Sequence, residues 1–406
     1  MRYLEPEILR FLGEDSKMAF ISGPRQVGKT TFVKHLLSSF GRENAYFNWD
    51  IESQRKAILK NPETFWRNAL APEAHGKPRI ALDEIHKYPR WKRFLKGLYD
   101  ASGKEAQFLV TGSGRLDVYQ RGGDSLVGRY GLYRLHPFTL GEIISPSRHS
   151  VLRPEQFWKS CLSESPAGAE EALGLLERFS GFPEPLFAAN DERLRRFRRS
   201  RDELVLREDL RDLTRIRDVG LIDSLAALLP ERVGSPLSIN ALREDLGVAF
   251  NTARGWIEIM ARLYYLFEIR PFAGTLARAL RREGKVYLYD FTRIENPGAR
   301  FENLVALHLL KLCDAWNDWG YGDFSLHYIR DKEKREADFL ITASGKPYAL
   351  MEAKLSDGQV DPSLRYYMAR LKPRFCLQIV RRAGAQSRGG NGQPHVVAAS
   401  QFLSRI

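Results

Sequence analysis

The feature that most constrains this chain is a glycine-bounded loop near its start, which meets the pattern G-x-x-x-x-G-K-[ST]. The loop directly follows the apolar run Met18 to Ser22 and precedes a helical pattern. Glycines let successive backbone N–H groups point into one concavity, and the N-terminus of the next helix adds its dipole. The sequence therefore predicts a phosphate-binding loop between a strand and a helix. Its residues are Gly23, Pro24, Arg25, Gln26, Val27, Gly28, Lys29, Thr30 and Thr31.

Two side chains of this loop and two later carboxylates have predicted roles in nucleotide chemistry. Lys29 is expected to reach the β- and γ-phosphates, and Thr30 to ligate Mg²⁺. A second apolar run, residues 79–82, ends in Asp83 and Glu84. Asp83 is expected to hold the metal through water, and Glu84 to polarise the attacking water. Together the two motifs predict an ATPase with ATP and Mg as its cofactors.

Short apolar runs alternate with helical patterns over residues 18–135, which predicts an α/β fold with a parallel sheet covered on both faces. One run ends at Thr111 and is followed by Ser113; these hydroxyls either sense the γ-phosphate or belong to an ordinary glycine turn. After Pro146 the pattern becomes helical and predicts a helical lid. The expected strands are residues 18–22, 45–48, 79–83, 107–111 and 133–135.

Two short helices separated by a glycine are predicted within residues 238–263. Ser238 is expected to cap the first helix, Gly247 to turn the chain, and Asn251 to cap the second helix. Strand-like runs at residues 265–270 and 285–289 follow, and they complete the pattern of a winged helix. The second helix either reads a DNA groove or packs into a core.

Residues 296–406 show the order helix, three strands, helix and strand. Asp338 lies on one predicted strand, and Glu352 and Lys354 lie on the next. Alternation along a strand places Glu352 and Lys354 on the same face. Acids that converge on a hard cation, with a lysine beside them, suit metal-dependent cleavage of a phosphodiester. Glu352 and Lys354 are therefore candidate catalytic residues, and Asp338 and Glu352 candidate metal ligands.

These motifs together resemble a prokaryotic family of AAA-type P-loop ATPases, in which an N-terminal ATPase is followed by a winged helix and a C-terminal domain like the PD-(D/E)xK nucleases. The resemblance spans nearly the whole chain. It implies a sheet of AAA order and makes Arg129 the candidate for a charge-sensing arginine, acting within or between subunits. It also adds Glu302 as a metal ligand. The motifs that carry it are residues 23–31, 82–86, 111–113, 125–129, 137–142, 181–184 and 207–210.

The predicted organisation has four segments. They are an AAA-type ATPase core (residues 1–145), a helical lid and linker (146–220), a winged helix (221–295) and a PD-(D/E)xK nuclease-like α/β domain (296–406).

The net charge of +13 favours a polyanionic partner, and DNA is the predicted one. Three basic clusters supply part of the excess, although such runs are more often solvated helix faces. No apolar run approaches the ~20 residues of a membrane helix, and the first residues lack the layout of a secretory signal. We therefore expect a cytoplasmic protein, in which the three cysteines are buried thiols. The basic clusters lie at residues 193–201, 278–285 and 381–388.

Three functions fit these patterns. In the first, ATP binding and hydrolysis are coupled to DNA binding or to metal-dependent DNA cleavage. In the second, ATP controls DNA binding or homo-oligomer formation, and the nuclease-like domain is not catalytic. The third, a remodelling motor, has less support because no pore-loop pattern is present in the sequence.

Overall fold

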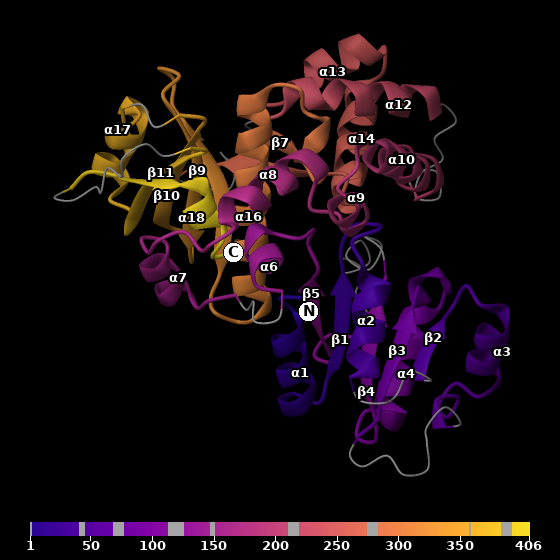
Figure 1. Cartoon of the computed structure of the whole chain (residues 1–406). Helices are drawn as coiled ribbons and strands as arrows, with labels where there is room; N and C mark the ends of the chain where they lie inside the picture. The colour runs from indigo at the N-terminus through magenta and orange to yellow at the C-terminus, as the bar shows by residue number, and fades with distance from the viewer. Residues whose placement is uncertain are drawn as a thin grey trace. The chain divides into compact units, whose positions relative to one another are not determined.

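The computed structural model describes most of the chain, and its described residues form two compact units (Figure 1). Unit 1 is Met1–His136 and unit 2 is Pro137–Ile406. The described residues are 2–39, 45–67, 77–112, 126–146, 151–209, 219–273, 283–356, 359–382 and 392–406.

Unit 1 is built on a parallel sheet of five strands in the order β2-β3-β4-β1-β5, drawn in indigo to purple in Figure 1. Strand β1, which lies between β4 and β5, is buried along its whole length, as expected for a parallel strand covered on both faces. The predicted α/β fold class is confirmed, and the strand order agrees with the expected AAA arrangement. The strands are β1 (Met18–Ser22), β2 (Tyr46–Asn48), β3 (Arg79–Asp83), β4 (Gln107–Thr111) and β5 (Tyr130–Arg134).

Amphipathic helices cover this sheet. In α2, Phe32, Val33, Leu36 and Leu37 recur at helical spacing and are buried, and the helix contacts β3 and β4. The first residue of α2 is Lys29, so the helix begins at the end of the glycine-bounded loop. The helical elements of unit 1 are α1 (Glu5–Glu14), α2 (Lys29–Ser38), α3 (Glu52–Lys60), the 3-10 turn η3 (Ile85–Lys87) and α4 (Trp91–Ser102).

Unit 2 begins at Pro137, before the predicted boundary after residue 145. The reason is a buried ion pair: Glu142 of α6 contacts Lys311 of α16 at 2.9 Å, and neither side chain is exposed. Helix α6 therefore folds with the later part of the chain. The helical elements up to residue 232 are α6 (Leu140–Ile144), α7 (Pro154–Ser160), α8 (Ala169–Phe179), α9 (Pro183–Ala188), α10 (Asp191–Asp202), η5 (Glu203–Asp209), α12 (Val219–Leu228) and η6 (Leu229–Arg232).

The segment predicted as a helical lid packs against the C-terminal part of unit 2. The Trp158 ring stacks on Phe375 with centroids 4.8 Å apart, and Phe157 meets Trp316 edge to face at 5.6 Å. Both residues lie on α7 and are buried. Burial of these large rings makes α7 part of the C-terminal core.

The predicted pair of short helices is present as α13 (Ile239–Leu246) and α14 (Phe250–Arg262). Ser238 caps α13 by accepting a hydrogen bond from the backbone N–H of Ala241, and Gly247 turns the chain with φ of 64°. The cap predicted at Asn251 is wrong, because α14 already begins at Phe250 and has no side-chain cap. Trp256 and Met260 are buried, so one face of α14 belongs to the core.

The strands after α14 join the C-terminal strands in one sheet of seven, in the order β12-β11-β10-β9-β8-β6-β7. Strands β6 and β7 pair antiparallel, and β6 also pairs in parallel with β8 through Arg270 and His327. No break in the sheet therefore separates the predicted winged helix from the nuclease-like domain at residue 295. The elements are β6 (Leu266–Pro271), β7 (Lys285–Leu288), η7 (Phe291–Arg293), α16 (Pro297–Asp318), β8 (Phe324–Arg330), β9 (Glu336–Ala343), β10 (Lys346–Lys354), α17 (Pro362–Leu371), β11 (Phe375–Val380), β12 (His395–Ala398) and α18 (Ala399–Leu403).

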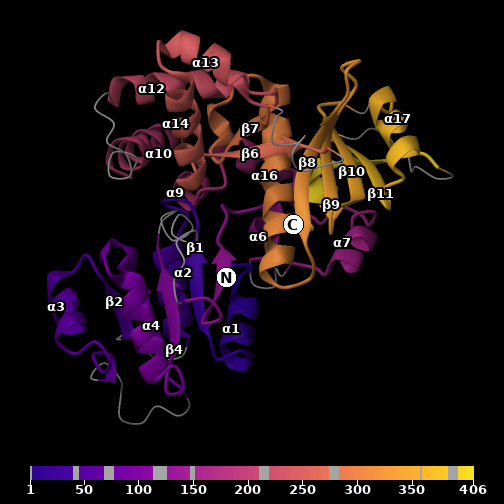
Figure 2. The same cartoon turned by 180° about the vertical axis from the view of Figure 1, so that it is seen from behind.

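Helix α16 contacts β7 to β10 of this sheet, and α17 contacts β9 and β10 (Figure 2). At the two ends of the sheet, α14 contacts β6 and α18 contacts β11 and β12. Strand β12 and helix α18 were not predicted from the sequence.

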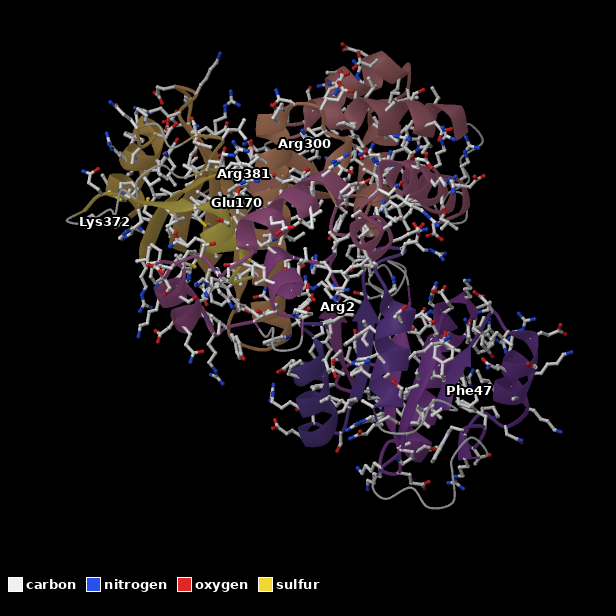
Figure 3. The ribbon with its side chains drawn as sticks, in the orientation of Figure 1. Arg2, Phe47, Glu170, Arg300, Lys372 and Arg381 are labelled. Carbon is white, nitrogen blue, oxygen red and sulfur yellow. The ribbon has the colours of Figure 1, made fainter. Side chains whose placement is uncertain are left out.

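Arg381, from the third basic cluster, forms ion pairs with Glu170 and Glu177 of α8, so its charge is neutralised within unit 2 (Figure 3). Among the described residues, no helix has both the length and the apolar composition needed to cross a membrane.

Candidate functional site

The glycine-bounded loop lies at the carboxyl end of β1, where parallel sheets present ligand sites. Gly23 has φ of 149°, and a Cβ there would collide with the carbonyl oxygen of Leu135, so only glycine fits. Gly28 has φ of 95° and stands at the N-cap of α2. Both positions explain why the loop needs glycine at these points in the sequence.

Lys29 folds back over its own loop. Its Nζ donates to the carbonyl oxygens of Gly23 at 2.9 Å and of Pro24 at 2.7 Å, and the residue is buried. The ammonium therefore already lies at the concave side of the loop, next to the backbone that would hold phosphates. Thr30 and Thr31 are exposed, and Arg25 and Gln26 are half-buried.

Asp83, at the end of β3, accepts hydrogen bonds from three hydroxyls. Thr30 Oγ1 donates to Oδ2 at 2.7 Å, Tyr46 OH donates to Oδ2 at 2.6 Å, and Thr111 Oγ1 donates to Oδ1. Burial and the neighbouring Asp83 raise the pKa of Tyr46. Thr111 thus faces Asp83, while Ser113, its predicted companion, lies outside the described residues. Neither β2 nor Tyr46 was included in the predicted site.

Glu84 follows Asp83 in a left-handed conformation, with φ of 56°. Its Oε2 atom is buried and has no hydrogen-bond partner among the described residues, although Lys87 Nζ lies 3.4 Å away. The carboxylate therefore retains an acceptor position close to Asp83.

Arg2 contacts the backbone of the loop, and no motif in the sequence indicated this contact. Its Nη1 donates to the carbonyl oxygen of Val27 at 3.1 Å, and its Nη2 to that of His136 at 2.5 Å. The guanidinium is buried and is labelled in Figure 3. A motif search misses Arg2 because it meets the loop only through the fold.

The structure corrects the expectation that Arg129 senses the γ-phosphate of its own subunit. The backbone N–H of Met18 donates to the Arg129 carbonyl oxygen, and Met18 begins β1, whereas the loop follows the other end of β1. Roughly 15 Å of strand separates these two ends. The Arg129 side chain pairs with Asp100 of α4 at 2.8 Å. A role at phosphate would require the loop of another subunit.

In unit 2 the four predicted C-terminal residues do meet. Glu352 Oε1 lies 2.7 Å from Lys354 Nζ, and Glu352 Oε2 accepts from the backbone N–H of Asp338 at 3.1 Å. Asp338 Oδ2 in turn accepts from the N–H of Ala353 at 3.0 Å. Glu302 of α16 is linked to Asp338 through Lys285, which contacts both.

Lys285, on β7, lies among these acids, and the sequence analysis assigned it no role there. Its Nζ lies 2.5 Å from Glu336, 3.2 Å from Glu302 and 3.7 Å from Asp338, and only 1% of its side chain is exposed. Burial alone would lower the pKa of Lys285, but the three carboxylates outweigh burial and raise it. Lys285 is therefore a charged ammonium. Tyr287 OH also donates to Glu302, at 2.7 Å.

The acids of this cluster are harder to ionise than exposed carboxyls. Burial, together with the charge of Asp338, raises the pKa of Glu302 to about 7, against the opposing effect of Lys285. The same two causes raise the pKa of Glu352 to about 8. Within the described ranges, no group of three or more His, Cys, Asp or Glu is arranged to hold a metal ion. The cluster therefore does not fit the predicted metal site formed by Glu302, Asp338 and Glu352.

Among the described residues of the basic clusters, the arginine-rich helix α10 carries several exposed guanidinium groups. Arg193, Arg196 and Arg199 are exposed and form no ion pair with any residue in the described ranges. Arg201 is fully buried and donates to the Tyr264 carbonyl oxygen. The predicted basic residues Arg278, Arg281, Arg282 and Arg388 lie outside the described residues.

Three protein-family models match successive parts of the chain. Residues 15–144 match a family described as an AAA domain. Residues 177–292 and 297–400 match two families that are each described as a domain of unknown function, DUF8612 and DUF4143. The first match agrees with the five-stranded parallel sheet of unit 1, and it supports an AAA-type P-loop ATPase domain there.

The chain is also similar to uncharacterized proteins of Mycobacterium tuberculosis and Mycobacterium bovis. It is 21% identical to each over 355 residues, which cover 86% of this chain and 73% of each relative. Among solved structures, it is similar to the Aeropyrum pernix ORC1 protein in complex with DNA, with 15% identity and a TM-score of 0.35 over 75% of this chain and 94% of that chain. The chain thus resembles AAA-domain proteins in residues 15–144.

Proposed function

We propose that this chain binds ATP together with Mg²⁺ and hydrolyses it at the carboxyl edge of the unit 1 sheet. The observation that carries the proposal is the 2.7 Å contact between Thr30 Oγ1 and Asp83 Oδ2, directly beside the loop that places Lys29. A hydroxyl and a carboxylate are the hard oxygen ligands that suit Mg²⁺. The match to an AAA domain covers the same residues.

The residues of this chain divide the work of binding. Thr30 and Asp83 would hold Mg²⁺, which, when bound, offsets charge on the phosphate oxygens. The loop backbone and the N-terminus of α2 bind the phosphates through N–H groups. Lys29 exchanges its two carbonyl acceptors for phosphate oxygens, which form stronger, charge-assisted hydrogen bonds with an ammonium group.

Glu84 is the proposed water-activating residue. Its carboxylate, on a side chain that is 15% exposed, accepts a hydrogen bond from the attacking water and so directs the water oxygen toward the γ-phosphate. The ammonium of Lys87 lies 3.4 Å from the Glu84 carboxylate. Glu84 therefore acts by positioning and polarisation and forms no covalent intermediate.

The test compares ATP affinity and phosphate release for three full-length variants. Lys29→Ala is expected to lose ATP binding. Glu84→Gln is expected to keep ATP binding and to lose about 10²-fold or more in hydrolysis, because general-base groups contribute on that order. Glu52→Gln is the control, since Glu52 is exposed on α3 and pairs with Lys56. Hydrolysis by Glu84→Gln at the parental rate would reject the role of Glu84.

We further propose that the chain binds DNA through the exposed face of α10. The supporting observation is the set of exposed guanidinium groups on Arg193, Arg196 and Arg199, which leaves a strong local positive charge. The second helix of the pair, α14, supports this less well, because its Arg254 is neutralised by Glu258 at 3.2 Å. Phosphate groups are the expected ligands of the α10 face.

A salt titration of DNA binding tests whether DNA binds at the α10 face or is attracted only by the net positive charge of the chain. Replacing the three arginines by glutamine should lower the slope of log affinity against log salt by about 2 to 3, since each phosphate contact contributes about 0.9. The control is the triple change of three exposed lysines elsewhere, which removes the same charge. They are Lys60, Lys104 and Lys346. Equal losses in both triple variants would mean that DNA binding is not localised on α10.

The two activities are proposed to be coupled, so that ATP controls DNA binding or homo-oligomer formation by the chain. For the nuclease-like domain, the contacts of Lys285 favour the non-catalytic alternative over DNA cleavage. Measuring DNA affinity with and without ATP, in the parent and in Lys29→Ala, tests the coupling. Affinity that does not respond to ATP in the parent would reject it.

A further inference from the structure

We propose that Lys285 is a built-in cation of the C-terminal carboxylate cluster, and that its ammonium stands where a nuclease of this general design would place a divalent metal ion. The cluster is then a permanent ionic framework, and the domain does not cleave DNA. This inference concerns unit 2 and does not depend on the proposed ATP chemistry.

The first support is the set of atoms around Lys285 Nζ. Glu302 comes from α16, Glu336 and Asp338 from β9, and all three place an oxygen within 3.7 Å of the ammonium. Carboxylate oxygens converging from separate elements are also what a hard dication needs. Lys285 therefore occupies oxygens of two of the three predicted metal ligands, Glu302 and Asp338.

The second support is that the other acidic oxygens already have partners. Glu352 is held by Lys354 and by the backbone N–H of Asp338. Lys354 also contacts Asp361 at 3.2 Å, which ties the predicted catalytic lysine to α17. A dication entering this cluster would have to displace these contacts and would face the charge of Lys285 a few ångströms away.

The third support is that the fold fixes Lys285 in place. Its backbone pairs with Ile269 in β6 and forms a bridge with Pro236 on its other side. The aliphatic part of the side chain is buried, and Nζ lies 5.6 Å from the centre of the Tyr328 ring. The ammonium cannot be exposed by a simple rotation at the surface, because the residue is 1% exposed.

The geometry also explains why the predicted winged helix and nuclease-like segments share one sheet. Lys285 is the first residue of β7, which belongs to the predicted winged-helix segment. Its ammonium forms ion pairs with acids of α16 and β9, which belong to the nuclease-like segment. Removing it would take away the cation that Glu302, Glu336 and Asp338 share. Lys285 therefore links the two segments electrostatically where β6 and β8 link them by hydrogen bonds.

The test is a Mn²⁺ titration of the nucleotide-free, full-length protein, followed by electron paramagnetic resonance. In the parent, no Mn²⁺ site is expected to depend on Asp338. Asp338→Asn should therefore bind the same amount of Mn²⁺ as the parent. Lys285→Met, which removes the ammonium and keeps most of the side-chain volume, is expected to gain one Mn²⁺ per chain. That gained site should disappear in Lys285→Met combined with Asp338→Asn. Lys346→Met is the matched control, because Lys346 is exposed at the start of β10.

Two results would overturn the proposal. One is a stoichiometric Mn²⁺ site in the parent that Asp338→Asn abolishes. The other is Mn²⁺- or Mg²⁺-dependent plasmid cleavage by the parent that Glu352→Ala abolishes. Both measurements use the parent protein, so the proposal is decided even if Lys285→Met does not fold. If Lys285→Met folds, its failure to gain a Mn²⁺ site also contradicts the proposal.

Discussion

Thr30 Oγ1 lies 2.7 Å from Asp83 Oδ2, although 53 positions separate the two residues in the chain. The parallel pairing of β1 with β4 and of β4 with β3 brings the carboxyl ends of these strands to one edge. The contact joins the phosphate loop to the acid at the end of β3, and it defines where a metal ion would be held.

Asp83→Asn should therefore impair hydrolysis far more than ATP binding. The amide is a weaker metal ligand than the carboxylate, and the loss of a preorganised charge in a catalytic site typically costs about 10²-fold in kcat. Steady-state phosphate release measures the effect, with a fluorescent ATP analogue to follow binding. Asp15→Asn, on the exposed residue after α1, is the control. A fall in Asp15→Asn equal to that in Asp83→Asn would contradict the assignment.

Gly23→Ala should weaken nucleotide binding and destabilise unit 1. A Cβ at Gly23 collides with the Leu135 carbonyl oxygen, which belongs to rigid backbone, so the loop must shift. Gly13→Ala is the matched control, because a Cβ at that helical position meets nothing within 4 Å. The control is expected to stabilise the protein slightly, by about 0.5–1 kcal/mol. Thermal unfolding and ATP affinity measure both variants, and similar behaviour of the two would refute the steric argument.

His308 should make unit 2 sensitive to acid. It is buried in α16, its Nε2 accepts from the backbone N–H of Leu140 at 3.2 Å, and its Nδ1 contacts the Leu304 carbonyl oxygen. Burial lowers the pKa of His308 to about 3, and the nearby Lys311 acts in the same direction while Glu142 opposes it. Between about pH 3 and pH 6.5 the imidazole is thus neutral in the folded protein and protonated in the unfolded chain.

The expected pH dependence has a definite sign. Above pH 6.5 His308 is neutral in both the folded and the unfolded state, and its full contribution to the free energy of unfolding is present. Below that pH only the unfolded state takes up the proton, so stability falls by about 1.4 kcal/mol per pH unit. Urea unfolding between pH 7 and pH 4.5 measures the slope, which should flatten in His308→Gln but persist in His395→Gln. An unchanged slope in His308→Gln would rule out His308 as the source.

Lys311→Met should destabilise unit 2 by about 3–5 kcal/mol, because it leaves Glu142 buried without its cation. Neither side chain of this pair is exposed. The double variant Lys311→Met with Glu142→Leu removes both charges and is expected to recover much of the loss. Chemical unfolding of the two single variants and the double variant measures the coupling. Strictly additive effects would show that the pair does not act as a unit.

Local patterns in the sequence determined the parts of the protein that depend on near neighbours along the chain. The phosphate loop, the acids at the end of β3 and the Ser238 cap follow from spacing and backbone chemistry within a few residues. The strands of the C-terminal sheet other than β12 followed from apolar alternation, and so did the placement of Glu352 beside Lys354. These features need no knowledge of the tertiary fold.

Only the tertiary structure decided which distant groups meet. Arg2 reaches Val27, Lys285 enters the acids of α16 and β9, and Arg129 lies at the end of β1 away from the loop. Each of these outcomes depends on strand order and on which sheet edge a residue occupies, because a side chain can contact only what the paired strands bring beside it. Spacing in the sequence carries no record of such long-range pairing.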